Sequence, residues 1–150
     1  MKSYDTVAGL KAHLGQVLAT SDWVLVDQAR INQFADATGD HQWIHVDPER
    51  ARGGPFGGPI AHGFLSMSLL SALMASAFEI RQLRMAVNYG LNKVRFISPV
   101  PVGSRVRAHF KLLAWEEIDA GGAQLVLEAS MEMEGAAKPA CVAELIVRMY

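Results

Sequence analysis

The sequence has little cysteine, no surplus of charge and no long hydrophobic run, and each shortage excludes a class of protein. Cys141 is the only cysteine, so no disulfide can form within the chain, and a reducing compartment is expected. The formal net charge is -1, without the Lys and Arg clusters that nucleic acids or anionic membranes require. The uncharged run from Phe64 to Phe78 is shorter than the ~20 apolar residues of a membrane span.

The length and the N-terminus narrow the possibilities further. A chain of 150 residues with 51% hydrophobic content suffices for one core, so we expect residues 1–150 to form a single domain. Residues 1–20 contain no unbroken apolar segment after Lys2, unlike a secretory signal. We therefore expect a cytoplasmic protein with neither a nucleic acid nor a membrane as partner.

A polar stretch, residues 37–63, concentrates the groups that can move protons near neutral pH. It holds three of the five histidines, His41, His45 and His62, together with the aspartates Asp40 and Asp47. The reference pKa values of a carboxylate (~4) and an imidazole (~6.5) are close enough to neutral for burial and neighbouring charges to tune either. We interpret this stretch as the functional site.

The residues before this stretch predict helices and one short strand. Apolar side chains at spacings of three and four predict an amphipathic helix over residues 4–19, although Gly9 and Gly15 weaken it. A short strand is expected at residues 23–26. Asp27 then stands where an N-cap would stand, and Gly39 follows the next helical segment as a C-cap glycine does.

Within and after the stretch, the pattern changes from loop to helix and then to strands. Asp40 to His45 is expected to be a loop or single turn, and Asp47-Pro48 begins a brief helix that ends at Arg52. Residues 53–59 predict a mobile loop, and residues 64–78 predict a buried helix. Alternating apolar residues then predict strands at 91–97, 105–112, 125–133 and 141–149. An α+β domain follows, in which an antiparallel sheet curls around one central helix.

These residues resemble the MaoC-like, (R)-specific enoyl-CoA hydratases, and particularly their single-domain, NodN-like branch. The resemblance extends over most of the chain and is carried by Ala37-Thr38-Gly39-Asp40, His45, Asp47, Phe56 and Ile60-Ala61-His62-Gly63-Phe64. It departs at Gln42-Trp43, where many members have Asn-Pro, but the spacing of five between acid and histidine is kept. The resemblance implies a hotdog fold, an antiparallel β-sheet wrapped around a long central α-helix.

The resemblance also implies a reaction and a site. Water would add to trans-2-enoyl-CoA to give (R)-3-hydroxyacyl-CoA, through a single water held by Asp40 and His45, and either group could act first as the base. The backbone N–H of Gly63, at the start of the central helix, would bind the thioester oxygen. Ser71 matches a position of that family that helps to order the site. Coenzyme A is part of the substrate, and neither a further cofactor nor a metal is expected.

Other interpretations remain open at this point. A hotdog thioesterase would hydrolyse the same substrates, and a non-enzymatic protein would only bind acyl-CoA. His41, His45, Asp47 and His62 could instead be ligands of zinc. His62 is more simply a residue that packs against, or hydrogen-bonds, the loop beside the site.

Two further expectations concern the pocket and the assembly. Trp43 and Phe56 could belong either to the core or to the walls of an acyl pocket. A single hotdog domain leaves a sheet edge and part of its helix uncovered, so we expect a homodimer with a joined sheet.

Overall fold

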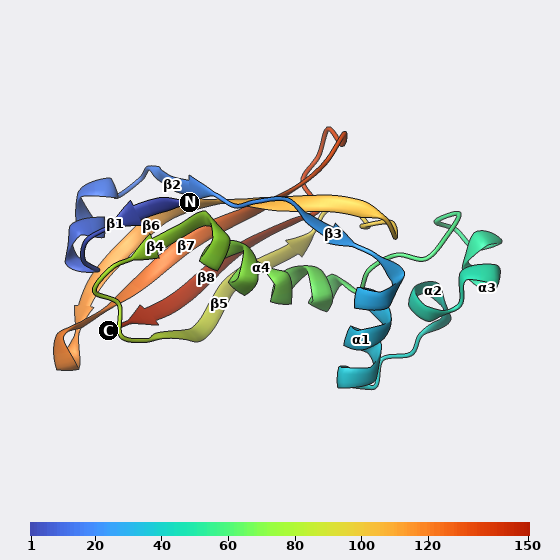
Figure 1. Cartoon of the computed structure of the whole chain (residues 1–150), viewed down its shortest axis with the longest axis horizontal. Coiled ribbons are helices and arrows are strands. Elements are labelled where there is room, and N and C mark those ends of the chain that lie inside the picture. The colour runs from blue at the N-terminus through green and yellow to red at the C-terminus, as the bar shows by residue number, and fades with distance from the viewer.

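A computed structural model describes all residues from 1 to 150 and shows a twisted antiparallel sheet packed along one helix (Figure 1). The six-stranded sheet has the order β2-β6-β7-β8-β5, and β3 also pairs with β6. Its strands are β2 (Val17–Thr20), β3 (Val24–Val26), β5 (Ala86–Phe96), β6 (Ser104–Ile118), β7 (Gly122–Met133) and β8 (Cys141–Met149). The predicted α+β architecture is confirmed, although two of the short strands precede the first α-helix.

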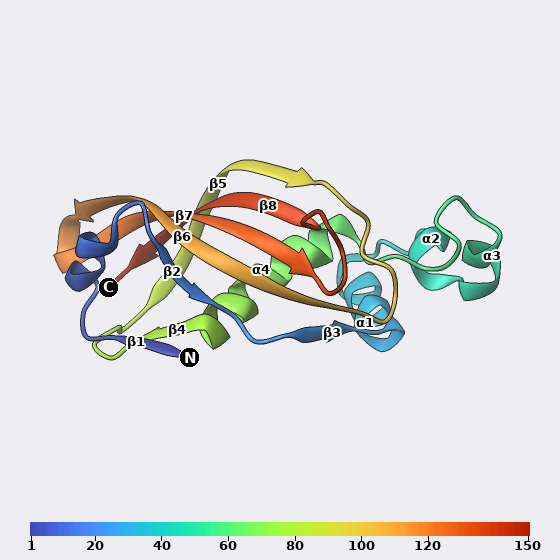
Figure 2. The same ribbon diagram turned by 90° about the horizontal axis from the view of Figure 1, so that it is seen from above.

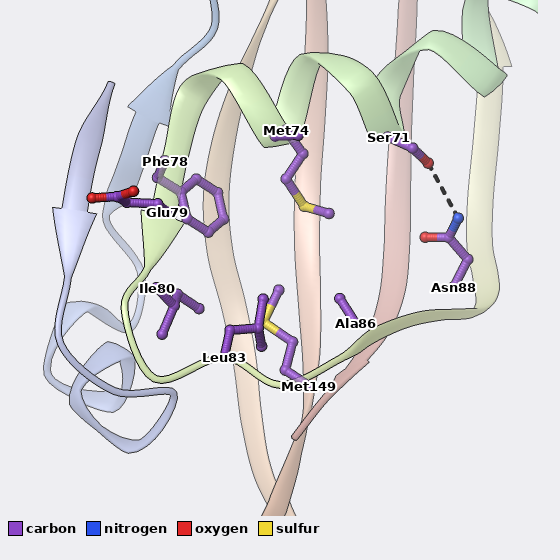
Figure 3. A pocket seen from close by; sticks show the side chains of 10 residues that line it. Ser71, Met74, Phe78, Glu79, Ile80, Leu83, Ala86, Asn88 and Met149 are labelled. Atoms are coloured by element: carbon purple, nitrogen blue, oxygen red, sulfur yellow. Dashed lines mark hydrogen bonds between the residues drawn. The ribbon is translucent and has the colours of Figure 1, made fainter.

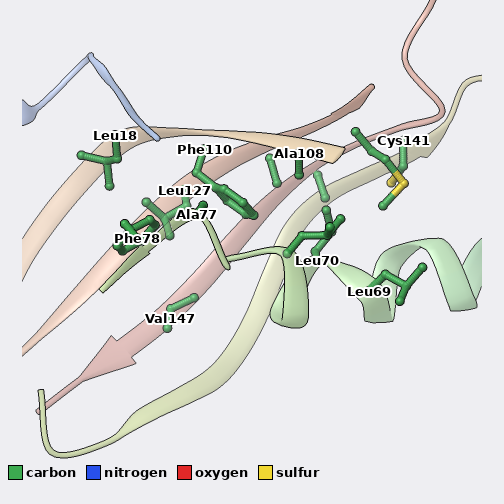
Figure 4. Close-up of a cluster of buried hydrophobic side chains, with 14 of the residues drawn as sticks. Leu18, Leu69, Leu70, Ala77, Phe78, Ala108, Phe110, Leu127, Cys141 and Val147 are labelled. Atoms are coloured by element: carbon green, nitrogen blue, oxygen red, sulfur yellow. The ribbon is translucent and has the colours of Figure 1, made fainter. Parts of the chain in front are cut away.

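The three long neighbouring strands β6, β7 and β8 bury every second side chain, as their sequences predict. Phe110 of β6 is fully buried and faces Ala129 of β7 across the ladder. Leu127 and Val147 extend the same apolar layer (Figure 4). Burying one such side chain stabilises a fold by about 1.5–3 kcal/mol, so this face of the sheet anchors the core.

The central helix, α4 (Gly63–Ala77), runs along that apolar face (Figure 2). Leu65, Leu69, Leu70 and Leu73 point into the core, so the predicted helix is confirmed. The opposite side of the helix is uncovered, and Phe64 is 64% exposed. The helix is therefore buried on one face only, and part of it is uncovered, as expected for a single hotdog domain. No helix of the structure is long and apolar enough to cross a membrane.

The predicted N-terminal helix over residues 4–19 is wrong. The segment forms β1 (Lys2–Tyr4), a 3-10 helix (Ala8–His13) and β2. Gly15, with φ of 77°, adopts a left-handed conformation that breaks a helix. Tyr4 donates a hydrogen bond from its hydroxyl group to the carbonyl oxygen of Leu18 at 2.9 Å. Of the apolar residues at helical spacing, Leu10 and Leu18 reach the core, whereas Leu14 and Val17 are exposed.

Strand β1 joins a small second sheet that the sequence pattern did not predict. It pairs in parallel with β4 (Phe78–Ile80), which follows α4 directly. Phe78 and Ile80 of β4 are buried, and Glu79 between them is exposed. The pairing therefore ties the N-terminus to the C-terminal end of the central helix.

Three short helices gather near the start of α4, beyond the end of the sheet (Figure 1). They are α1 (Gln28–Thr38), α2 (Trp43–Val46) and α3 (Pro48–Arg52). The Asp27 carboxylate caps α1 by accepting a hydrogen bond from the N–H of Arg30, and Gly39 ends it with φ of 78°. The Asp47 carboxylate caps α3 in the same way through the N–H of Arg50. These boundaries are as predicted, and they bring the polar stretch to the N-terminus of α4.

Candidate active site

The polar stretch folds so that one acid and two histidines come together. Asp40 follows the C-cap of α1, His45 lies in the single turn of α2, and His62 is the N-cap residue of α4. One possible ligand or proton-transfer atom from each of the three side chains lies within 4.8 Å of the other two. Asp40 is exposed, whereas His45 and His62 are only 6% and 2% exposed. A charged acid at the surface thus meets two buried imidazoles.

The ring of His45 is oriented by a backbone carbonyl. Its Nδ1 atom lies 2.7 Å from the carbonyl oxygen of Ile60. Because a carbonyl oxygen only accepts, Nδ1 carries the hydrogen, and in the neutral ring the lone pair is on Nε2. The N–H of Ile60 in turn donates to the carbonyl oxygen of Ile44 at 3.0 Å, which fixes the two segments together.

Burial of His45 favours the neutral form of its ring. The pKa of His45 is lowered from 6.5, mainly because burial penalises the charged form, and His62 lowers it further. The carbonyl of Ile60 and the Asp40 carboxylate oppose this effect without reversing it. His45 is therefore neutral near pH 7 and can accept a proton at Nε2.

Asp40 owes its position to the turn that follows α1. Its N–H donates to Thr38 Oγ1 and its Oδ1 accepts from the N–H of Gln42, both at 3.4 Å. These long contacts leave most of the hydrogen-bonding capacity of the carboxylate free. An exposed carboxylate beside a buried neutral imidazole can hold a water molecule between two groups that exchange protons.

His62 contacts both members of this pair. Its Nε2 lies 2.9 Å from the carbonyl oxygen of Asp40, and its ring stacks on the ring of His45 with centroids 3.9 Å apart. On its other side, His62 meets the ring of Phe34 at 5.0 Å. The expectation that His62 packs and bonds beside the site is confirmed.

The start of α4 offers backbone donors next to this cluster. His62 caps the helix without a side-chain hydrogen bond, and the first N–H groups of a helix have no intrahelical partner. A Cβ atom on Gly63 would lie 3.0 Å from the ring of Phe96. Phe96 and Phe56 line a cavity of about 300 Å³ that also reaches Gly63. The missing side chain of Gly63 therefore leaves room for a neighbouring ring as well as for any ligand.

Ser71 does not join the cluster. It lies eight residues beyond Gly63, which places it about 12 Å further along the helix axis. Its Oγ accepts a hydrogen bond from Asn88 Nδ2 at 3.1 Å (Figure 3). Ser71 and Met74 line an apolar cavity of about 410 Å³ between α4 and β5. A role for Ser71 in ordering the site stays a prediction, and its direct contacts belong to this second cavity.

The four residues of the alternative zinc site are not gathered as a set. His41 is exposed, with Nε2 3.9 Å from the carboxylate of Asp36, and Asp47 caps α3. The group that does come together is Asp40, His45 and His62. In that group, one nitrogen of each imidazole is already engaged by a backbone carbonyl.

Several partners of the site had no signal in the sequence. The carbonyl oxygens of Ile60 and Asp40 belong to the backbone, so no residue type predicts their role. Gln28 Nε2 donates to the carbonyl oxygen of His45 at 2.8 Å, and such a contact is equally invisible. The contact of Phe34 with the ring of His62 likewise has no signal in the sequence.

The two aromatic residues left open by the sequence take different positions. Trp43 is half-buried, with the guanidinium of Arg50 4.5 Å from its ring. A Cβ atom on Gly54 would lie only 2.9 Å from the Trp43 ring, so the loop after α3 packs tightly against it. Phe56 is 47% exposed and lines the cavity at Gly63. Neither ring belongs to the main core, and Phe56 is the one beside the start of α4.

Comparison with known proteins agrees with this arrangement. A family model described as a MaoC like domain matches residues 10–130. The chain is 54% identical over 148 residues to 3-hydroxyacyl-thioester dehydratase Z of Mycobacterium tuberculosis, covering 99% of this chain and 98% of that protein. It is 49% identical over 146 residues to Nodulation protein N of Rhizobium leguminosarum bv. viciae, covering 94% and 89%.

Among solved structures, the (R)-hydratase from A. caviae superposes with a TM-score of 0.71. It is 27% identical, and the match covers 89% of this chain and 94% of that one. The predicted hotdog fold is therefore confirmed.

Proposed function

The chain belongs to the MaoC like domain family, and on this premise we propose that it is a hydro-lyase, an (R)-specific enoyl-CoA hydratase. It would add water to trans-2-enoyl-CoA to give (R)-3-hydroxyacyl-CoA, or catalyse the reverse dehydration. The observation that carries this proposal is the pairing of the exposed Asp40 carboxylate with the buried ring of His45, whose Nε2 is left free by the Ile60 contact. A dehydratase and an (R)-hydratase among its relatives support the same chemistry.

The proposed reaction uses one water molecule between the two side chains. One group removes a proton from the water, and the resulting hydroxide forms a bond to C3 of the enoyl thioester. The electron pair of the double bond moves toward the thioester oxygen as an enolate, and a proton is then delivered to C2. Because Asp40 and His45 are neighbours, both additions occur on one face of the substrate. Either group can act first as the base.

The enolate oxygen needs a donor that is already in place. The free N–H groups at the start of α4 provide one, together with the positive end of the helix dipole. Gly63 is the first residue of this helix and sits beside a cavity, which supports its backbone N–H as the donor to the thioester oxygen. Losing one such donor typically costs about 2.7–4 kcal/mol of transition-state stabilisation. The proposed reaction requires no group beyond the substrate and these residues.

We further propose a homodimer formed through β5. This strand pairs with β8 along one side only, so its other edge is open over its length. Large apolar side chains are exposed on or next to it, namely Met85, Val87, Tyr89, Leu91, Phe96 and Ile97. An open, apolar edge of this length is a template for pairing with another chain. A second copy in antiparallel register would join the two sheets and cover the exposed side of α4.

The single cysteine supports a reducing compartment, and we propose the cytoplasm. Cys141 is unpaired and buried. Burial raises the pKa of its thiol to about 11, so the reactive thiolate is scarce at neutral pH. The thiol is therefore a packing group of the core.

Incubation of the purified protein with crotonyl-CoA tests the proposal. Hydration removes the absorbance of the enoyl group while the thioester stays intact, and chiral analysis of the product should give the (R) alcohol. Release of free thiol would instead identify a thioesterase. Saturable binding without turnover would identify an acyl-CoA-binding protein.

A further inference from the structure

His62 is connected to all three parts of the proposed machinery. Its Nε2 lies 2.9 Å from the carbonyl oxygen of Asp40, its ring stacks on that of His45, and its own peptide bond leads to Gly63. It is almost completely buried. A residue with these contacts can set the distances among acid, base and oxyanion donor.

Resting on the function proposed above, we propose that His62 is a positioning residue of the active site. It holds the Asp40 turn, the His45 ring and the start of α4 in one fixed arrangement. It does not itself touch the reacting atoms.

A hydrogen bond connects His62 to the backbone of Asp40. Since the carbonyl oxygen of Asp40 accepts, His62 Nε2 carries the hydrogen, and its tautomer is fixed. The other contacts of the Asp40 turn, with Thr38 and Gln42, are long at 3.4 Å. Of these three hydrogen bonds of Asp40, the 2.9 Å bond from His62 is thus the shortest. Without it, the carboxylate would sample positions away from the shared water.

His62 is also the middle ring of a stack of three rings. Phe34 from α1, His62 from α4 and His45 from α2 form a column, with centroid separations of 5.0 and 3.9 Å. The electrostatic effect of His62 lowers the pKa of His45, in the same direction as burial. Asp40 is the charged group that opposes this effect, and α1 contributes only the uncharged Phe34 and Gln28. The column therefore helps to keep the base both fixed and neutral.

The remaining ring nitrogen argues against a role in packing alone. His62 Nδ1 is buried without a hydrogen-bond partner, and an unpaired buried nitrogen destabilises a fold. An apolar ring would fill the same space without this penalty. The imidazole keeps an Nε2–H donor that such a ring lacks.

Two variants separate the donor from the ring. His62→Phe keeps an aromatic ring in the column but removes the donor to Asp40. His62→Gln removes the ring but places an amide donor near the former Nε2 position. His109→Gln is the control, because His109 is a half-exposed histidine that hydrogen-bonds Glu132 outside this cluster.

For His62→Phe we expect kcat for crotonyl-CoA hydration to fall on the order of 100-fold, because small misplacements of catalytic groups have effects of this size. KM should change by less than about threefold, and the unfolding midpoint should be retained. His62→Gln should recover at least about tenfold of the lost kcat. In both variants the acidic limb of kcat/KM should move to higher pH, because His62 lowers the pKa of His45.

An NMR titration of the His45 ring provides a readout that does not depend on turnover. A rise in the pKa of His45 in both variants supports the influence of the His62 imidazole on His45, even if the wild-type protein fails to hydrate crotonyl-CoA. Failure of the proposed function and failure of this inference are therefore distinguishable. Unchanged kcat in His62→Phe would overturn the inference. A second pair of results would also overturn it. In this case kcat falls equally in both variants, in proportion to the fraction of unfolded protein, and the pKa of His45 is the same as in the wild type.

Discussion

The Nδ1 atom of His45 and the carbonyl oxygen of Ile60 are 2.7 Å apart, and this contact decides which nitrogen of the ring is free for chemistry. Ile60 belongs to the segment that leads into α4, so the orientation of the proposed base, His45, is coupled to the position of the proposed oxyanion donor, Gly63. The ring of His45 is thus oriented by a backbone carbonyl rather than by a second carboxylate.

Substitution of His45 should separate the structural contact from the chemistry. In His45→Asn the amide nitrogen can still donate to the carbonyl of Ile60, whereas His45→Ala leaves that carbonyl without its partner. Both variants should lose activity by about 10²- to 10⁴-fold, the usual contribution of a positioned base. Only His45→Ala should lose about 1–3 kcal/mol of folding free energy, measured by urea unfolding. Equal stability of the two variants would contradict the proposed tautomer.

The buried imidazole should make folding stability depend on pH. The pKa of His45 is lowered in the folded state from its ordinary value of 6.5, chiefly by burial. As the pH falls below this value, the unfolded chain takes up the proton first, so the free energy of unfolding should decrease toward the folded pKa. Above pH 6.5 the contribution is fully present.

Urea unfolding between pH 7 and pH 5 measures this slope. His45→Asn should flatten it, and His41→Gln, which replaces an exposed histidine of the same turn, is the matched control. The acid Glu132, whose pKa is lowered mainly by the hydrogen bond from Arg107, acts below its ordinary 4.5 and so outside this range. A slope that is identical in wild type and His45→Asn would show that His45 does not titrate as described.

Gly63 should tolerate a methyl group sterically but not functionally. In Gly63→Ala the new Cβ would lie 3.0 Å from the Phe96 ring, which is 47% exposed and can move aside. We expect a loss of at most about 1 kcal/mol of stability, but a fall in kcat on the order of tenfold or more if the thioester approaches the backbone here. The double variant with Phe96→Ala should relieve the contact. Recovery of full activity in this double variant would mean that Gly63 serves only the packing of Phe96.

The open edge of β5 should control assembly. Leu91→Lys adds a charge to that edge, and we expect a shift from dimer to monomer in size-exclusion chromatography with light scattering. Val17→Lys is the matched control, since Val17 is an exposed residue on β2, the strand at the opposite end of the sheet. A monomeric wild type, or a dimer that both variants retain, would contradict assembly through β5.

The sequence predicted those elements whose boundaries depend on local chemistry. The cap residues Asp27, Gly39 and Asp47 act through hydrogen bonds within a few residues or through a left-handed φ, so their positions were correct. The long strands were also predicted, because the alternation of apolar and polar residues has the period of two that is typical of strands. The predicted helix over residues 4–19 failed because its spacing of three and four does not mark one buried face: Leu10 and Leu18 are buried, whereas Leu14 and Val17 are exposed.

The candidate site could be predicted only as a set of side chains. The acid and histidine of the stretch, Asp40 and His45, do lie together, and His62 does bond the neighbouring loop. Which nitrogen of each imidazole is free depends on the backbone carbonyls of Ile60 and Asp40, and these have no residue-specific signal. Ser71 matches a position of the resembled family, but its contact with Asn88 depends on how β5 lies against α4.

The proposed catalysis by Asp40 and His45 is tested most directly by measuring hydration of crotonyl-CoA. The variants are Asp40→Asn and His45→Asn, measured beside the wild type and Asp36→Asn. Asp36 is an exposed acid on the neighbouring helix, so its variant controls for loss of surface charge. We expect (R)-3-hydroxybutyryl-CoA from the wild type and from Asp36→Asn, and losses of activity of about 10²-fold or more in Asp40→Asn and His45→Asn. Hydration at the wild-type rate by both Asp40→Asn and His45→Asn would contradict it.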